Sequence, residues 1–233
     1  MRNIAIGDIH GSAVALHTLL ETLNVADDRL IFLGDYIDRG PQSQQVLATL
    51  LELSANQNHI FLRGNHDEWL LRARTEKRWF KTWLGDGVGG KETLRSYGAS
   101  AFDVTALSLI PEAHFDFLES TRLFFQTDYE IFVHASISWQ EPEDNDPQQL
   151  LWPFFNDIAP HPSGKRIVCG HTSQPRGLPF DKGYAVCIDT YCYGGGWLTA
   201  LIVDSNEVIQ ANQQGQIRQF LLGEPPGAPV NSR

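Results

Sequence analysis

The chain has 233 residues, of which 42% are hydrophobic and 20% are charged. Such a composition is typical of a globular protein with a core of its own, and it excludes disordered and fibrous chains. The formal net charge of −10 makes the body of the protein repel polyanions. We therefore expect neither nucleic acid nor a membrane as a partner, and the sequence is compatible with a monomer.

The three cysteines, Cys169, Cys187 and Cys192, include no C-x-x-C pair. Their odd number argues against a disulfide framework and favours a reducing compartment. No run approaches the ~18 consecutive apolar residues of a membrane helix. The first apolar segment, residues 4–6, is too short for the core of a signal peptide. We therefore expect a cytoplasmic protein.

Short apolar runs alternate with helical periodicity in the first third of the chain, and strands dominate afterwards. The expected strands are 3–6, 29–33, 60–63, 131–133, 166–169, 184–188, 197–203 and 208–211. The expected helices are 12–23, 43–55, 67–78, 91–97 and 111–120. This order predicts one α/β (α+β) domain, residues 1–222, with two packed sheets flanked by helices. Residues 223–233, rich in proline and glycine, are expected to form a flexible tail.

Five of the apolar runs end at a residue that can bind a metal ion. The segments at these ends are GDIHG (7–11), GDYIDRG (34–40), RGNHD (63–67), VHAS (133–136) and CGHT (169–172). Singly they are weak signals, because Gly-Asp after a strand is usually a turn, and Asp67 is the expected N-cap of the helix that follows it. Jointly they favour one site, since the carboxyl ends of strands in an α/β sheet line one crevice.

These motifs, in this order, resemble those of the calcineurin-like metallophosphoesterases, and within them the phosphoprotein phosphatases of small bacterial and phage type. The resemblance spans residues 7–201 and implies a four-layer sandwich of two mixed β-sheets flanked by helices. It also implies two divalent ions, for which we expect Mn²⁺, with Fe or Zn as alternatives. The residues it assigns to them are Asp8 and His10 on the first ion, Asp35 as the bridge, and Asn65, His134 and His171 on the second.

The resemblance further implies hydrolysis by direct attack of a metal-bridging hydroxide. Seven protein bonds to two octahedral ions leave about five positions for water and phosphate oxygens. His66 would protonate the leaving group, with Asp38 orienting its imidazole. Arg39 and Asn65 would bind the phosphate, although a surface ion pair is the alternative for Asp38 and Arg39. Arg63 would either bind the edge of the substrate or support the site from behind.

The expected activity is metal-dependent hydrolysis of phosphomonoesters, above all phosphoserine and phosphothreonine of proteins, with phosphotyrosine and small phosphoesters as further substrates. One alternative is a symmetrical dinucleoside tetraphosphatase, an enzyme that typically has alanine in place of Asp38 and lacks the counterpart of Arg63. A second alternative is a non-catalytic phosphate-binding scaffold, which predicts the loss of a ligand. Many relatives carry a second phosphate-binding arginine in a W-x-R stretch. This chain has Trp152-Pro153-Phe154 there. The phosphate clamp is therefore either weaker or completed by Arg166, Arg176 or another residue.

Overall fold

The structure is a computed structural model, and it describes residues 1–231. Its strands are β1 (Asn3–Ile6), β2 (Arg29–Phe32), β3 (Ile60–Phe61), β4 (Phe124–Gln126), β5 (Glu130–Val133), β6 (Arg166–Cys169), β7 (Phe180–Asp181), β8 (Ala185–Cys187), β9 (Asp189–Thr190), β10 (Trp197–Ile202), β11 (Glu207–Ala211), β12 (Gln216–Leu221) and β13 (Val230–Asn231). Its α-helices are α1 (Ala13–Thr22), α2 (Ser43–Leu53), α3 (Asn65–Thr75), α4 (Lys77–Trp83), α5 (Gly90–Ser96), α6 (Glu112–Ser120) and α7 (Pro147–Leu151). Short 3₁₀ helices cover Val104–Leu109, Pro142–Asp144, Phe155–Asp157 and Cys192–Gly194.

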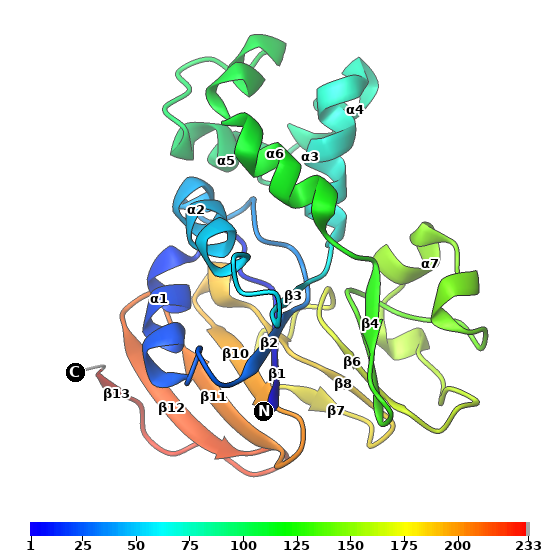
Figure 1. Cartoon of the computed structure of the whole chain (residues 1–233). Coiled ribbons are helices and arrows are strands. Elements are labelled where there is room, and N and C mark those ends of the chain that lie inside the picture. Colours follow the sequence, from blue (N-terminus) through cyan, green and yellow to red (C-terminus); the bar gives the residue numbers. More distant parts are fainter. Residues whose placement is uncertain (232–233) are drawn as a thin grey trace.

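The strands form two mixed sheets (Figure 1). The larger sheet has the order β13-β12-β11-β10-β1-β2-β3, with β9 also paired to β10. The smaller sheet has the order β4-β5-β6-β8-β7. The strands β1, β2 and β3 are parallel to one another, as are β5, β6 and β8, so each sheet has a parallel half with its carboxyl ends at one edge.

The two sheets pack face to face through a buried apolar layer. Along β1, Ile4 and Ile6 belong to the cluster on the helical side, while Ala5 belongs to the cluster between the sheets. Strands buried on both faces read as continuous apolar runs rather than alternating ones. Val168 and Leu201 contribute to the same inner layer from opposite sheets. The predicted pair of packed sheets is confirmed.

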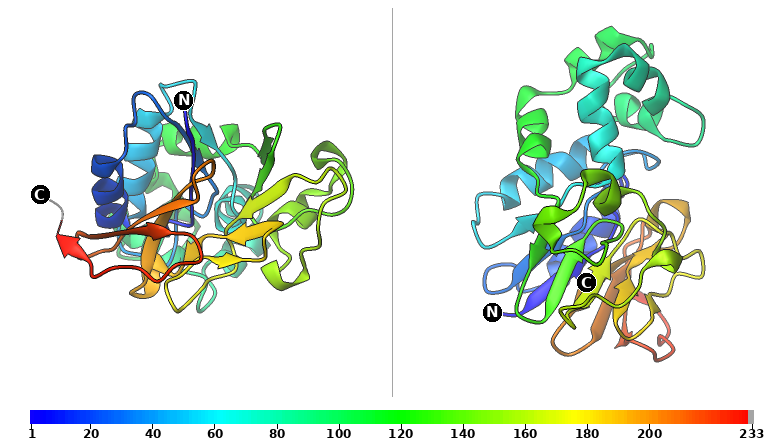
Figure 2. Two further views of the ribbon diagram at one scale, coloured as in Figure 1. Left: turned by 90° about the horizontal axis from the view of Figure 1, so that it is seen from below. Right: turned by 90° about the vertical axis from the view of Figure 1, so that its right-hand side faces the viewer.

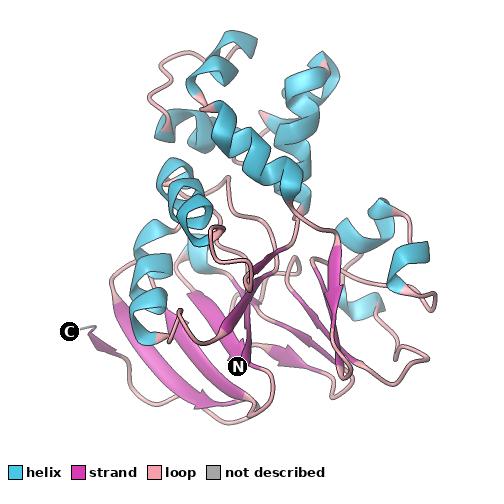
Figure 3. Ribbon diagram, viewed as in Figure 1, coloured by secondary structure: helices cyan, strands magenta, loops and turns pink. Residues whose placement is uncertain are grey.

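Helices cover both outer faces of this sandwich. The helix α1 packs on β10 and β11 of the larger sheet, and α7 contributes Leu150 to the core on the outer side of the smaller one. The helices α3 to α6 project above the sheets as a separate group, which the right-hand view of Figure 2 and the colouring of Figure 3 make clear. This group stands over the edge at which the parallel strands end (Figure 1).

The helix expected at residues 67–78 is wrong in extent. The structure has α3 and α4, separated by Glu76, whose backbone is extended with φ −132° and ψ 119°. The first of these helices begins at Asn65, so Asp67 lies in its first turn and is not its N-cap; the N-cap is Gly64. The Asp67 carboxylate accepts a hydrogen bond from the Gly64 N–H at 2.8 Å, which satisfies one unpaired donor at the helix start.

The expected flexible tail contains β13, whose residues pair with Gln216 and Ile217 of β12. Residues 232 and 233 of that tail lie outside the described residues. The division into one domain and a flexible tail stays a prediction. No helix within residues 1–231 is both long enough and apolar enough to span a membrane.

Candidate metal centre and catalytic site

The loops that follow the parallel strands are joined at one edge of the sandwich. The backbone N–H groups of Ile9 and His10, after β1, donate to the carbonyl of Asp35, after β2, at 3.1 and 2.8 Å. The imidazole of His134, after β5, reaches across from the other sheet, with its Nδ1 2.9 Å from the carbonyl oxygen of Leu33. The strand ends of both sheets therefore meet at one place.

Several residues at this edge have left-handed backbone conformations. The φ angles are 44° at His10, 52° at Asp35, 72° at Asp38, 65° at Arg39 and 63° at His171. Such angles are rare outside glycine and cost on the order of 1 kcal/mol or more each, so they persist where the surrounding structure imposes them. Backbone strain of this kind clusters at functional sites.

Two glycines allow the carboxylates to approach the backbone. A Cβ at Gly64 would collide with the side chain of Asp35, and a Cβ at Gly170 would collide with that of Asp8. The Asp8 carboxylate also accepts the His171 N–H at 3.0 Å. The glycine before Asn65 and the glycine before His171 therefore have the same use, which is room for a carboxylate.

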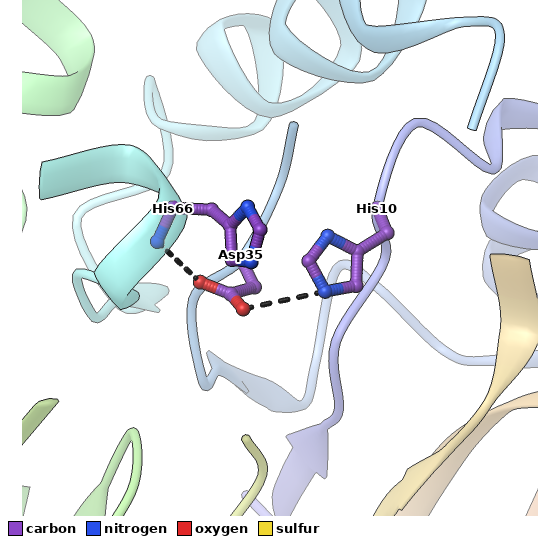
Figure 4. Close-up of side chains that lie close together, drawn as sticks. All are labelled: His10, Asp35 and His66. Carbon is purple, nitrogen blue, oxygen red and sulfur yellow. Dashed lines mark hydrogen bonds and ion pairs between the residues drawn. The ribbon is translucent and has the colours of Figure 1, made fainter. Parts of the chain in front are cut away.

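Asp35 lies at the centre of the site. Its Oδ2 is 3.3 Å from His10 Nε2, and its Oδ1 accepts the His66 backbone N–H at 3.0 Å (Figure 4). Its Oδ1 is also 3.5 Å from His134 Nε2. Two groups of ligand atoms, each within 4.8 Å of one another, share this carboxylate: one with His10 and His66, the other with His134 and His171. The structure thus brings Asp35 beside His10, His134 and His171. The expected ligand Asp8 belongs to neither group, whereas His66, which was expected as the proton donor, belongs to the first.

Asn65 completes the second group. Its Oδ1 is 2.9 Å from both His134 Nε2 and His171 Nδ1. The other ring nitrogen of His171 donates to the carbonyl of Trp152 at 3.0 Å, as Nδ1 of His134 does to Leu33. A carbonyl can only accept, so these bonds leave the lone pairs of His134 Nε2 and His171 Nδ1 directed at Asn65. Such bonds to the second nitrogen are how proteins orient metal-binding imidazoles.

In the first group, a backbone carbonyl orients the imidazole of His10 in the same way. Its Nδ1 donates to the carbonyl of Ile37 at 2.8 Å, which leaves the Nε2 lone pair towards Asp35. Asp8 is only 3% exposed. Its pKa lies well above the usual range, because of burial first and then the nearby charges of Asp189 and Asp35.

The ionisation of these side chains is compatible with the binding of metal cations. Burial acts to raise the pKa of Asp35, but the imidazoles of His134 and His66 outweigh it and hold that pKa well below its usual range. Burial also lowers the pKa of His134, which favours the neutral ring that binds a metal. The carboxyl groups of Asp8 and Asp35, the imidazoles and the amide oxygen of Asn65 form a mixed oxygen and nitrogen donor set that suits divalent metals.

His66 and Asp38 form a buried pair next to this centre. His66 Nδ1 is 2.7 Å from Asp38 Oδ2, and the two side chains are 2% and 0% exposed. Burial raises the pKa of Asp38 to about 7, and burial lowers the pKa of His66 well below its usual range. A surface ion pair, the alternative for Asp38, is excluded by this burial.

The guanidinium of Arg39 lies at the same edge. Its Nη1 is 2.7 Å from His10 Nε2, and its centre is 4.6 Å from the ring of Tyr193. Arg39 and Tyr193 also line an open pocket of about 480 Å³ that continues to Lys91 and Arg95 of α5. A planar guanidinium at the mouth of a pocket can bind two phosphate oxygens at once.

Arg63 has other partners. Its Nε donates to Thr121 Oγ1 at 3.1 Å, its Nη1 donates to Glu68 at 3.1 Å, and its Nη2 donates to the carbonyls of Leu118 and Glu119 at 3.2 and 2.9 Å. These bonds satisfy carbonyls at the end of α6. Of the two roles expected for Arg63, these hydrogen bonds favour structural support of the site over a contact with the substrate.

The two candidates for the second phosphate-binding arginine lie in different surroundings. Arg166 bonds Asn206 at 2.6 Å and lies 3.3 Å from Asp181. Arg176 lines a different pocket, together with Leu178 and neighbouring residues.

Sequence reasoning missed four residues that the structure brings to the site. Asp189 follows β8 just as the expected ligands follow their strands, so the same signal could have found it. Tyr193 stands in the turn before β10, while Trp83 and Thr93 come from the helical group and donate to Asp38. No local pattern marks these last three.

Residues 1–202 match the family described as calcineurin-like phosphoesterase. The chain belongs to this family. Its members use divalent metals, and this phosphoesterase carries candidate ligands for them at the edge described above. It is a hydrolase of phosphoesters.

Curated relatives of this phosphoesterase have two kinds of activity in their names. It is 30% identical to serine/threonine-protein phosphatase 1 of Salmonella typhimurium over 83% of this chain and 88% of that protein. It is 28% identical to the asymmetrical bis(5'-nucleosyl)-tetraphosphatase PrpE of Anoxybacillus flavithermus over 88% of this chain and 91% of that protein.

Solved structures share the fold of this phosphoesterase. A protein described as a candidate diadenosine tetraphosphatase superposes with a TM-score of 0.65 at 20% identity, covering 90% of this chain and 92% of that one. A cold-active protein tyrosine phosphatase superposes with a TM-score of 0.64 at 17% identity, covering 95% and 79%. The predicted fold class is confirmed by this likeness.

Proposed function

We propose that this phosphoesterase removes phosphate from phosphoserine and phosphothreonine of proteins. The observation that carries the proposal is the buried pair of His66 and Asp38, with 2.7 Å between Nδ1 and Oδ2. The alkoxide of serine or threonine is a strongly basic leaving group that needs a proton as its bond to phosphorus breaks. A nucleoside phosphate leaving group is a weaker base and needs that proton less. An oriented acid is therefore of most use with a phosphomonoester.

Six side chains would hold two divalent ions, which we propose to be Mn²⁺: Asp8, His10, Asp35, Asn65, His134 and His171. When bound, the ions supply Lewis acidity and a nucleophile at neutral pH. Around them, Arg39 would bind phosphate oxygens through its planar donors. In its doubly protonated form, His66 would donate the proton from Nε2 while its Nδ1–H stays bonded to Asp38. Asn65 would in addition contact a phosphate oxygen through its amide.

A dinucleoside tetraphosphatase is the second candidate. It is favoured by the relative from Anoxybacillus flavithermus, whose match extends over 88% of this chain. The pocket beside Arg39 also contains Lys91 and Arg95, whose charges suit further phosphates of such a substrate. The completeness of the ligand set and of the His66–Asp38 pair argues against the non-catalytic scaffold, which was the second alternative to a phosphomonoesterase.

A substrate panel tests the proposal. Phosphoserine, phosphothreonine and phosphotyrosine peptides and diadenosine tetraphosphate are incubated with the protein and Mn²⁺, with chelator as the negative control. We expect the highest kcat/KM with phosphoserine or phosphothreonine, and a loss of at least about 100-fold in His66→Asn. Faster turnover of diadenosine tetraphosphate, with little effect of His66→Asn, would favour the second candidate. Binding of phosphopeptides without turnover of any substrate would favour the scaffold.

A further inference from the structure

The Asp38 carboxylate is held by side chains from the helical group above the sheets. The indole Nε1 of Trp83, at the end of α4, is 3.0 Å from both Oδ1 and Oδ2. The hydroxyl of Thr93, in α5, donates to Oδ1 at 2.7 Å. Trp83 and Thr93 lie 45 and 55 residues beyond Asp38 in the chain. Two helices that carry no expected metal ligand thus reach the acid pair.

These contacts constrain the backbone of Asp38 as well as its side chain. Thr93 Oγ1 accepts the Asp38 N–H at 2.9 Å while donating to the carboxylate of the same residue. Thr93 and Trp83 are both 0% exposed, so water cannot replace either donor. Asp38 has a φ of 72°, a conformation that needs such external support.

The bonds determine which lone pair remains for His66. Oδ1 receives both Thr93 and Trp83, whereas Oδ2 lies 2.7 Å from His66 Nδ1 and shares only the indole N–H. A carboxylate held by three donors cannot rotate about its Cβ–Cγ bond without losing a charge-assisted hydrogen bond. Its plane therefore sets the orientation of the imidazole, and with it the direction of Nε2.

We propose that Trp83 and Thr93 are positioning residues of the hydrolysis: by fixing the Asp38 carboxylate, they aim the His66 imidazole at the leaving oxygen. This inference rests on the proposed function, in which His66 is the proton donor. It extends the group of residues that deliver the proton from two to four, and the two added residues come from α4 and α5.

The effect of a misaligned proton donor depends on the leaving group. Phenolate is a much stronger base than p-nitrophenolate, so phenyl phosphate needs the proton more than p-nitrophenyl phosphate does. We expect Thr93→Val and Trp83→Phe to lower kcat on phenyl phosphate on the order of tenfold, with a much smaller loss on p-nitrophenyl phosphate and little change in KM. Thr93→Ser, which keeps the hydroxyl, should restore most of the activity.

Two matched control variants change residues of α4, the helix that carries Trp83. Trp79 in α4 has an indole N–H with no hydrogen-bond partner within residues 1–231, so Trp79→Phe should leave both rates unchanged. Thr82 has an exposed hydroxyl whose hydrogen-bond partner is the carbonyl of Arg78, so Thr82→Val should do the same.

Three outcomes would overturn the inference: equal losses on both substrates, a loss in Thr93→Ser as large as in Thr93→Val, or equal losses in the control variants. Failure of the proposed function is a separate result, because the substrate panel measures it with the unchanged protein. In that case the unchanged protein fails to hydrolyse the phosphoserine and phosphothreonine peptides of the substrate panel, whatever it does with the two aryl esters.

Discussion

Burial holds the imidazole of His171 in its neutral form. It lowers the pKa of His171 to about 4, and the neighbouring His134 adds to the effect. In the unfolded chain the same group titrates near 6.5. Between these pH values the unfolded chain binds the proton and the folded chain does not, so the free energy of unfolding falls as the pH falls. Above pH 6.5 both states are neutral, and this contribution to the pH dependence vanishes.

We therefore expect chelator-treated protein to lose stability between pH 8 and pH 5, and His171→Gln to lose less. The difference should be on the order of 2 kcal/mol, at about 1.4 kcal/mol for each pH unit below 6.5. Urea denaturation at a series of pH values measures it. The control is His17→Gln, because His17 is exposed on α1. An unchanged pH dependence in His171→Gln would contradict this account.

The guanidinium of Arg39 offers geometry as well as charge. It lies 4.6 Å from the ring of Tyr193, a stacking arrangement that suits a planar cation. We expect Arg39→Lys to lower kcat/KM on phenyl phosphate on the order of tenfold, because an ammonium group keeps the charge but loses the paired donors. Steady-state kinetics of Arg39→Lys and of the control Arg78→Lys, an exposed arginine on α4, check this. Equal losses of kcat/KM in the two variants would show that the paired donors of the Arg39 guanidinium do not contribute to catalysis.

Strands could be predicted where both faces are buried. All eight expected strands overlap observed ones, because their apolar runs come from a sheet covered on two sides. The strand β12 was missed because Ile217 is its one buried residue and the others are partly buried or exposed, so it lacks such a run. The break between α3 and α4 was missed as well, since the helical periodicity continues through Glu76 while its backbone is extended.

Local sequence could likewise predict only the part of the site that follows strands. Asp35 and His171 stand directly beyond apolar runs, so the pattern indicated them, and the family resemblance supplied their roles. Trp83 and Thr93 reach Asp38 from distant helices. Their placement depends on how the helical group packs over the sheets, and no spacing in the sequence encodes that.

The segment between α4 and α5 is expected to depend on one glycine. Gly89 has a φ of 104°, and a Cβ there would collide with the backbone of Arg39. Gly98 has a φ of 85° with no neighbour for a Cβ within 4 Å. Gly98→Ala should therefore cost only the backbone strain, about 1 kcal/mol. Gly89→Ala should cost more stability and also lower kcat, because it displaces Arg39 and α5. Thermal denaturation and kinetics of the two variants measure this, and equal effects would contradict it.

The whole molecule carries a net charge of −10, yet a phosphate dianion must approach it. The average field repels such a substrate, so attraction has to come from a local group of cations. Arg39, Lys91 and Arg95 line one pocket. Lys91 lies 3.3 Å from Asp86, and Arg95 lies 2.6 Å from Glu92. These pairs are exposed and therefore weak, so an anionic group of the substrate can compete for the cations.

A pair of double variants separates the pocket from the overall charge. Lys91→Gln with Arg95→Gln removes two positive charges inside the pocket, and Lys77→Gln with Arg78→Gln removes two on α4. We expect the first to raise KM for diadenosine tetraphosphate about fivefold more than KM for phenyl phosphate at low salt, with the difference shrinking as salt screens the charges. The second should raise both KM values alike, since it changes only the net charge. If the two double variants behave the same, the field of the whole molecule decides substrate approach and the pocket has no selectivity for further anionic groups.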